Sequence, residues 1–78
     1  MDSLLHRITL NPAVCHGKPT IRHSRVMVAT ILELLSAGST FDELKEDYPN
    51  LEEDDVRACL AYATRLVNFQ FIPHISAA

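Results

Sequence analysis

Apolar side chains recur at helical spacing in the central part of the chain. Val28, Ile31, Leu32 and Leu35 fall at positions i, i+3, i+4 and i+7, which places them on one face of a helix. Gly38 follows, and glycine readily adopts the left-handed conformation that ends many helices. We therefore predict a helix over residues 28–37.

A second helix is predicted directly after this glycine. Thr40 and Glu43 have the spacing of a capping box, in which each side chain accepts a hydrogen bond from the backbone N–H of the other residue. Phe41 and Leu44 begin the apolar face, and Pro49 ends the helix because proline disfavours a helical residue before it.

A third and longest helix follows, to about residue 68. Its predicted apolar face is formed by Val56, Leu60, Ala63 and Val67, and Asn50 is available as its cap. Only short connections separate the three helices, a spacing compatible with a helix-turn-helix arrangement.

A short β element is predicted before the helices. Residues 7–10 alternate polar with β-favouring side chains and stop at Asn11-Pro12, and a second strand is expected near Thr20–Ile21 or Val26. The alternative is an irregular arm over residues 8–26. The predicted fold is therefore mainly α: a three-helix, helix-turn-helix-like (winged-helix-like) domain with a short N-terminal β element.

The C-terminal tail, residues 68–78, allows two interpretations. Phe69 and Phe71 are two residues apart, as on one face of a strand. A last helical turn whose aromatic side chains cover the core fits equally well, and both alternatives stay open.

The length of 78 residues supports one domain, over residues 1–78. A core of this size rarely supplies more than about 3–5 kcal/mol, so we expect stabilisation by a second copy. Candidate residues for a homodimer interface are Ile8 and Leu10 in the β element and Ala58 and Tyr62 in the third helix. Packing within the chain is the alternative for the helical pair, and Cys59 is expected in the core or an interface.

The segment at the N-terminus lacks the apolar run of a signal peptide, and no stretch approaches the roughly 18 apolar residues that a membrane span needs. Two cysteines, Cys15 and Cys59, do not make a disulfide framework. We therefore expect a soluble, cytoplasmic protein in a reducing compartment.

Charge is divided unevenly along the chain. Residues 1–28 hold four cations and one acid, whereas residues 29–78 hold three cations and nine acids. This polarity indicates either a basic surface for an anionic partner or pairing of opposite ends between chains.

Several motifs occur together in a recognisable order. They are Gly17-Lys18-Pro19-Thr20-Ile21, Arg25-Val26-Met27-Val28, Leu34-Leu35-Ser36-Ala37-Gly38, Tyr48-Pro49-Asn50-Leu51 and Asp55-Val56-Arg57-Ala58-Cys59-Leu60-Ala61-Tyr62-Ala63. Over residues 7–65 the chain resembles the bacterial family catalogued as domain of unknown function 433. The resemblance implies a small helix-turn-helix-like domain with an N-terminal β element, usually dimeric. It also implies an antitoxin whose partner is a PIN-like ribonuclease toxin encoded beside it.

The chain departs from the family pattern at two places. His23-Ser24 stands where the family usually has Gly-Thr, so a turn that needs a positive φ there would be strained. Glu52 stands where a Thr or Ser often caps the third helix, and Asn50 is the expected substitute.

Candidate DNA-binding residues are Lys18, Arg22 and Arg25, with Arg7 as a fourth possible phosphate contact. The alternative is a structural role, in which Arg22 and Arg25 pair with acids of the second half, including Glu33, Asp42 or Asp47, in the same or the neighbouring subunit.

The start of the third helix is acidic and therefore unsuited to a DNA groove. Glu52, Glu53, Asp54 and Asp55 suit the positive end of the helix dipole and would be repelled by phosphates. They are interpreted either as solvated acids or, together with Phe69 and Phe71, as the docking face for a basic toxin.

A catalytic or metal site is not expected. Cys15, His16 and His23 are close in sequence, but a zinc site wants a fourth ligand and paired spacing, and nucleophilic catalysis wants an orienting acid and a pocket. We expect no enzyme activity, no cofactor, no metal and no small-molecule substrate.

The leading functional hypothesis is thus an antitoxin-like, non-catalytic binding protein that neutralises a PIN-like ribonuclease toxin and is a candidate for binding its operator DNA. The alternative is a DNA-binding transcriptional regulator, or a plain protein-interaction module, without a toxin partner.

Overall fold

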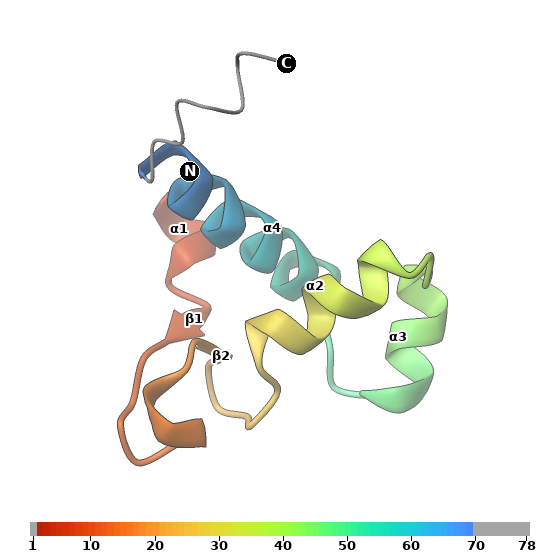
Figure 1. Ribbon diagram of the computed structural model, residues 1–78. Coiled ribbons are helices and arrows are strands. Elements are labelled where there is room, and N and C mark those ends of the chain that lie inside the picture. Colours follow the sequence, from red (N-terminus) through yellow and green to blue (C-terminus); the bar gives the residue numbers. More distant parts are fainter. Residues whose placement is uncertain (1, 70–78) are drawn as a thin grey trace.

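The computed structural model describes residues 2–69 (Figure 1). It is mainly helical, and a short hairpin joins its N-terminal part to the helices. In chain order the elements are α1 (Asp2–Leu5), β1 (Ile8–Thr9), a 3-10 turn η1 (Cys15–Gly17), β2 (Thr20–Ile21), α2 (Val28–Ser36), α3 (Phe41–Asp47) and α4 (Glu53–Phe69). The predicted fold class and all three predicted helices are confirmed.

The two strands form an antiparallel pair, so the irregular-arm alternative is wrong at these positions. Ile8 lies opposite Ile21 and Thr9 opposite Thr20. The hydroxyl oxygens of the two threonines are 3.1 Å apart and share a hydrogen bond. Thr20 also forms an isolated bridge with Met27, directly before α2. The hairpin is therefore anchored to the first long helix.

The connection between the strands contains a turn that the sequence did not predict. Asn11 starts it with an Asx-type turn, in which its side-chain oxygen accepts a hydrogen bond from the backbone N–H of Ala13. Three consecutive residues then have positive φ values: Cys15 at 51°, His16 at 58° and Gly17 at 81°. Only the last is a glycine, so spacing and composition gave no warning of this left-handed run.

Helices α2 and α3 begin and end where their local chemistry predicts. Gly38 has a φ of 99° and follows α2, while the N–H of Ser39 donates to the carbonyl of Leu34, as in a Schellman motif. The capping box of α3 is complete. Thr40 Oγ1 accepts from the Glu43 N–H at 3.2 Å, and Glu43 Oε1 accepts from the Thr40 N–H at 2.8 Å.

The buried face of α4 differs in part from the predicted one, although Val56 lies in the core as predicted. Leu60 and Val67 are 47% and 72% exposed, so they do not face the core. The inward positions begin instead at Asp55, which is 7% exposed, and continue through fully buried Ala58 and Cys59. Tyr62, the next position of this i, i+3, i+4, i+7 series, packs partly buried against the core.

The core lies where α4 crosses α2 and the hairpin. Its buried members come from every long element: Ile21, Val28, Ile31, Leu44, Leu51, Val56 and Cys59. The short helix α1 packs against α4 (Figure 1). The N-terminal end of the described chain thus lies along its last helix.

Ile31 tests how much this core contributes to stability. Its side chain is fully buried, and shortening such a side chain to alanine costs about 2–5 kcal/mol. A domain of this size has about 3–5 kcal/mol in total. We therefore expect Ile31→Ala to be largely unfolded at 25 °C, and Ile31→Val to lose about 0.5–1.5 kcal/mol in urea denaturation. A cooperative, near wild-type transition for Ile31→Ala would contradict this description of the core.

Candidate functional site

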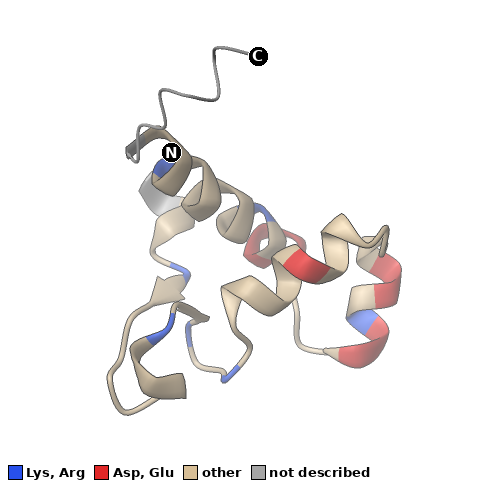
Figure 2. Ribbon diagram, viewed as in Figure 1, with Lys and Arg blue, Asp and Glu red and all other residues tan. Residues whose placement is uncertain are grey.

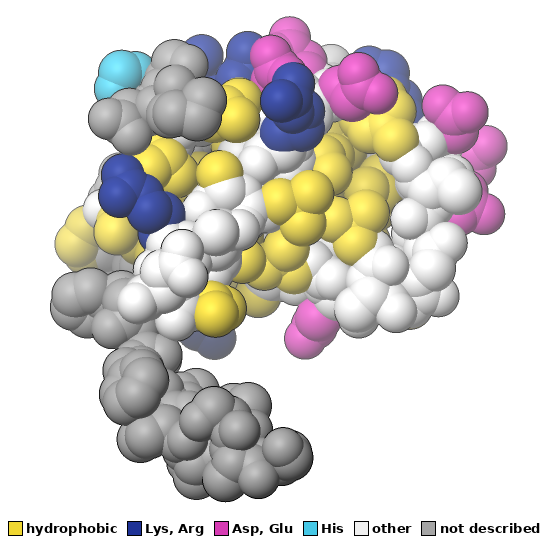
Figure 3. Space-filling model, turned by 90° about the horizontal axis from the view of Figure 1, so that it is seen from above, with side chains coloured by type: hydrophobic (Ala, Val, Ile, Leu, Met, Phe, Trp, Pro, Cys, Tyr) yellow, Lys and Arg dark blue, Asp and Glu magenta, His cyan; other side chains and the backbone are white. Residues whose placement is uncertain are grey.

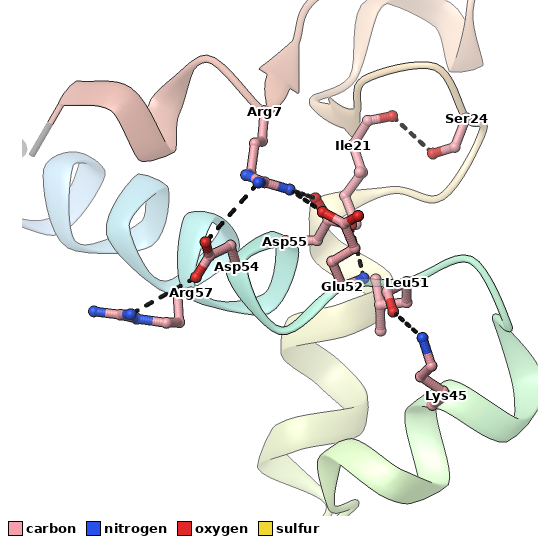
Figure 4. Close-up of polar contacts among 9 residues, drawn as sticks. All are labelled: Arg7, Ile21, Ser24, Lys45, Leu51, Glu52, Asp54, Asp55 and Arg57. Carbon is pink, nitrogen blue, oxygen red and sulfur yellow. Dashed lines mark hydrogen bonds and ion pairs between the residues drawn. The ribbon is translucent and has the colours of Figure 1, made fainter.

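A charged cluster joins the end of α1 to the start of α4 (Figure 4). Arg7 Nη1 lies 2.7 Å from Glu52 Oε1 and 3.0 Å from Asp55 Oδ1, and Nη2 lies 3.9 Å from Asp54 Oδ2. The hydrogen bonds to Glu52 and then to Asp55 raise the pKa of the Arg7 guanidinium above its ordinary value. Arg7 is therefore a permanent cation held between strand β1 and helix α4.

Asp55 satisfies two groups at once. Its Oδ1 accepts from Arg7, and its Oδ2 accepts from the backbone N–H of Glu52 at 2.9 Å. Glu52 directly precedes the first residue of α4, so Asp55 caps the helix from within its first turn. The expectation that Asn50 caps this helix is wrong, because the Asn50 side chain forms no hydrogen bond within residues 2–69 and the residue directly before α4 is Glu52.

These contacts change the interpretation of the acidic helix start. Asp55 is buried and paired, so it is neither a solvated acid nor available to a toxin. The side chains of Glu52 and Asp54 remain 65% and 50% exposed while they contact Arg7, and Glu53 is exposed. Arg7 is occupied by the same contacts and is not a phosphate ligand.

The three DNA-binding candidates are placed differently from Arg7. Lys18, Arg22 and Arg25 are all exposed. Among residues 2–69, none of their side chains forms an ion pair, so pairing of Arg22 and Arg25 with Glu33, Asp42 or Asp47 within one chain is wrong. Pairing with these acids of a neighbouring subunit stays a prediction. Figure 2 shows the result: the hairpin and its loops carry cations only, while acids gather on α3 and at the start of α4.

A tight loop holds Arg22 and Arg25. The Ser24 hydroxyl donates to the Ile21 carbonyl at 2.7 Å (Figure 4). It also accepts from the Val26 N–H at 3.1 Å. Between the two arginines, His23 has a φ of 62°, a positive value at the position where the family usually has glycine. Ser24 thus stabilises a loop that presents two arginines, at the expense of strain at His23.

The sequence profile of the family described as "Protein of unknown function (DUF433)" matches residues 8–63, more than half of the chain. The chain belongs to the DUF433 family. The crystal structure of a DUF433 member protein from Anabaena variabilis ATCC 29413 is similar, with a TM-score of 0.73 and 31% sequence identity. The match covers 82% of this chain and 63% of that protein, so the chain spans less than two thirds of this relative's length. None of the curated proteins matches the chain.

The two cysteines of this DUF433 chain occupy different environments. Cys59 is fully buried, and burial raises the pKa of its thiol to about 11, with a further contribution from the Asp55 carboxylate. Cys15 is partly exposed, and its Sγ lies 3.6 Å from the Arg25 carbonyl oxygen. No group of three metal-ligating side chains occurs within residues 2–69. Over the same range, no helix has the length and apolar character to cross a membrane.

The dimer candidates of the DUF433 chain are spread over different surfaces. Ala58 is fully buried within the protomer, so its side chain does not reach a partner, and this assignment is wrong. Ile8 and Tyr62 pack partly buried against the core, whereas Leu10 is 61% exposed. Phe69 is the last residue of α4, and Phe71 lies outside the described residues.

Sequence reasoning missed the Arg7–Asp55 pair, although a signal was present. Asp55, Ala58, Cys59 and Tyr62 have the spacing of a buried helix face, but the acid at its first position favoured an outward assignment. A buried carboxylate needs a partner. An arginine at the edge of a predicted strand was the natural one to consider.

Asp55 is expected to be the most costly acid to remove from this DUF433 chain. Asp55→Ala leaves the Glu52 N–H without its acceptor and removes one of the two acceptors of Arg7, which costs about 1–3 kcal/mol. Asp55→Asn keeps an acceptor for the N–H and should fall between Asp55→Ala and wild type in urea denaturation. Glu53→Ala is the matched control, since it removes an exposed acid from the same helix turn. Equal stability of Asp55→Ala and Glu53→Ala would contradict the proposed role of Asp55.

The cysteines give a second prediction. In a Cys15→Ser variant, the remaining thiol should resist a disulfide reagent near pH 8 and react only as the protein unfolds. Because the thiol is held protonated in the fold, stability should fall as pH rises from about 8.5, the ordinary thiol pKa, towards about 11. Rapid labelling of Cys15→Ser under native conditions would show that Cys59 is accessible.

Proposed function

We propose that this DUF433 chain is an antitoxin-like, non-catalytic binding protein of the cytoplasm that acts as a homodimer. It neutralises a PIN-like ribonuclease toxin through its acidic end and contacts operator DNA through Lys18, Arg22 and Arg25. The observation that carries the proposal is the separation of charge over the surface (Figure 2). The three exposed cations have no acidic partner within residues 2–69, and the exposed acids lie on other elements.

The toxin-binding face is assigned to exposed acids, with apolar side chains as anchors. Glu52 and Glu53 remain exposed at the start of α4, and α3 adds Asp42, Glu46 and Asp47. A nuclease that binds RNA has a basic groove, and complementary charge favours fast and specific association. Figure 3 shows hydrophobic side chains exposed between charged ones on one face, which suits a protein partner. In the described part of the chain, the exposed large apolar residues include Leu10, Leu60, Leu66 and Val67.

The DNA-binding part rests on dimerisation. Three phosphate contacts per chain give a log–log salt slope of about −2.7, at about −0.9 per contact. Two copies double this number, which is closer to what a specific operator complex requires. The regulator hypothesis without a toxin makes the same DNA prediction, so the toxin assay has to separate the two.

Co-expression with the protein encoded by the adjacent gene tests the proposal. We expect a PIN-like ribonuclease to copurify and to lose RNA cleavage in the complex. Glu53→Gln should slow association several-fold at low salt, because charges at the edge of an interface act mainly on the association rate. Glu33→Gln is the control, because it removes the same charge from α2, outside the proposed toxin-binding face, and should leave the association rate near that of the wild type.

A neighbour that is not nuclease-like, or that neither copurifies nor loses activity, would contradict the antitoxin role. If the chain nevertheless binds promoter DNA under these conditions, the regulator hypothesis takes its place.

A further inference from the structure

A hollow lies beside the hairpin, between the β1–β2 connection and the loop after β2. Its volume is about 480 Å³, within the range of about 300–1,000 Å³ that is usual for ligand sites. We call it the basic hollow. The side chains that matter for its chemistry are those of Thr9, Asn11, Thr20, Arg22, His23 and Arg25.

The lining of the basic hollow contains donors and no carboxylate. Within residues 2–69, the side chains of Arg22, His23 and Arg25 donate to no protein acceptor. Asn11 uses its side-chain oxygen to accept from the Ala13 N–H, so its amide nitrogen is left to donate. An acid-free lining with several donors that lack acceptors favours an anion.

The two threonines add a further donor. Thr9 and Thr20 share one hydrogen bond between their hydroxyls, and whichever oxygen accepts it keeps its own proton. The loop itself is held by the two hydrogen bonds of Ser24. The arginines therefore extend from a backbone that is ordered without a ligand, which lowers the cost of binding.

A neighbouring cavity shows the contrast. On the other side of the same loop lies a cavity of about 280 Å³ that is also lined by Arg22 and His23. Asp47 and Asp55 line it as well, so its charge is mixed. The basic hollow, which lacks such acids, is the better place for an anion.

We propose that the basic hollow holds a phosphodiester segment of duplex DNA, with Asn11, Arg22, His23 and Arg25 as its hydrogen-bond donors. This inference rests on the nucleic-acid part of the proposed function and adds Asn11 and His23 to it. Among the described residues, no Phe, Tyr or Trp side chain lines the hollow, so these residues offer no platform on which the bases of a single strand would stack. Contacts of this kind position a protein on the duplex without reading its sequence.

Asn11→Asp is the sharpest test, because an aspartate also accepts from the Ala13 N–H and preserves the turn. Its carboxylate would face the phosphate, so we expect binding of a short DNA duplex to weaken about tenfold or more at about 50 mM salt. Asn68→Asp, the same change on the exposed end of α4, should alter binding less than about twofold. Fluorescence anisotropy measures the affinity of both variants for the duplex. For a duplex of scrambled sequence, the ratio of the Asn11→Asp affinity to the wild-type affinity should be the same as for the first duplex, because phosphate contacts do not read sequence.

Arg25→Gln separates this inference from the proposed function. It should weaken duplex binding and reduce the salt slope by about one unit per bound chain. If Arg25→Gln weakens binding and Asn11→Asp does not, the basic hollow is overturned while DNA binding stands. If the wild type binds no duplex, both fail and the toxin-binding role is unaffected. Two further results would overturn the assignment. One is tighter binding of single-stranded oligothymidine than of duplex. The other is displacement of the duplex by inorganic phosphate as effectively as by competitor DNA at matched ionic strength.

Discussion

The bond between Arg7 and Asp55 joins the two halves of this small domain. Arg7 comes from the connection into β1, and Asp55 sits 7% exposed in the first turn of α4. Burial of a carboxylate is tolerated only if its oxygens have hydrogen-bond donors. Here one oxygen of Asp55 accepts from the Arg7 guanidinium, and the other accepts from the Glu52 N–H. The hairpin and the longest helix are therefore held at one relative position by a contact that also caps that helix.

This contact divides the cations of the N-terminal part into two groups. Arg7 is structural, because its charge is used within the fold. Lys18, Arg22 and Arg25 are exposed and have no acidic partner among residues 2–69. Since α4 uses Asp55 internally, the acids that face solvent in the described part of the chain are those of α3, of the outer side of the α4 start, and Glu33 on α2. The Arg7–Asp55 pair thus removes one cation and one acid from the surface and leaves Lys18, Arg22 and Arg25 on other elements than the exposed acids.

The sequence predicted the elements whose signals are local. The capping box of Thr40 and Glu43, the glycine stop at Gly38 and the apolar spacing of α2 depend on residues within one or two turns, and the structure has them as expected. The buried face of α4 depended on a residue 48 positions away, Arg7, which supplies the positive charge that pairs with the buried Asp55. The left-handed run through Cys15, His16 and Gly17 could not be predicted from composition, because two of its three residues are not glycine.

The site was predictable in part for the same reason. Composition showed that Lys18, Arg22 and Arg25 share a segment without acids, but it did not show that Asn11 and Thr9 lie across a hollow from them. The strand register and the Asx turn bring these residues together, and both depend on tertiary pairing.

A double-mutant cycle on Arg7 and Asp55, followed by urea denaturation, tests the central claim most directly. Arg7→Met removes the donor to Asp55 Oδ1, and Asp55→Ala removes one acceptor of Arg7. The loss of stability in the double variant should therefore be clearly smaller than the sum of the two single losses. Simple additivity, with the two losses summing in the double variant, would show that the two side chains do not depend on each other and would contradict the account.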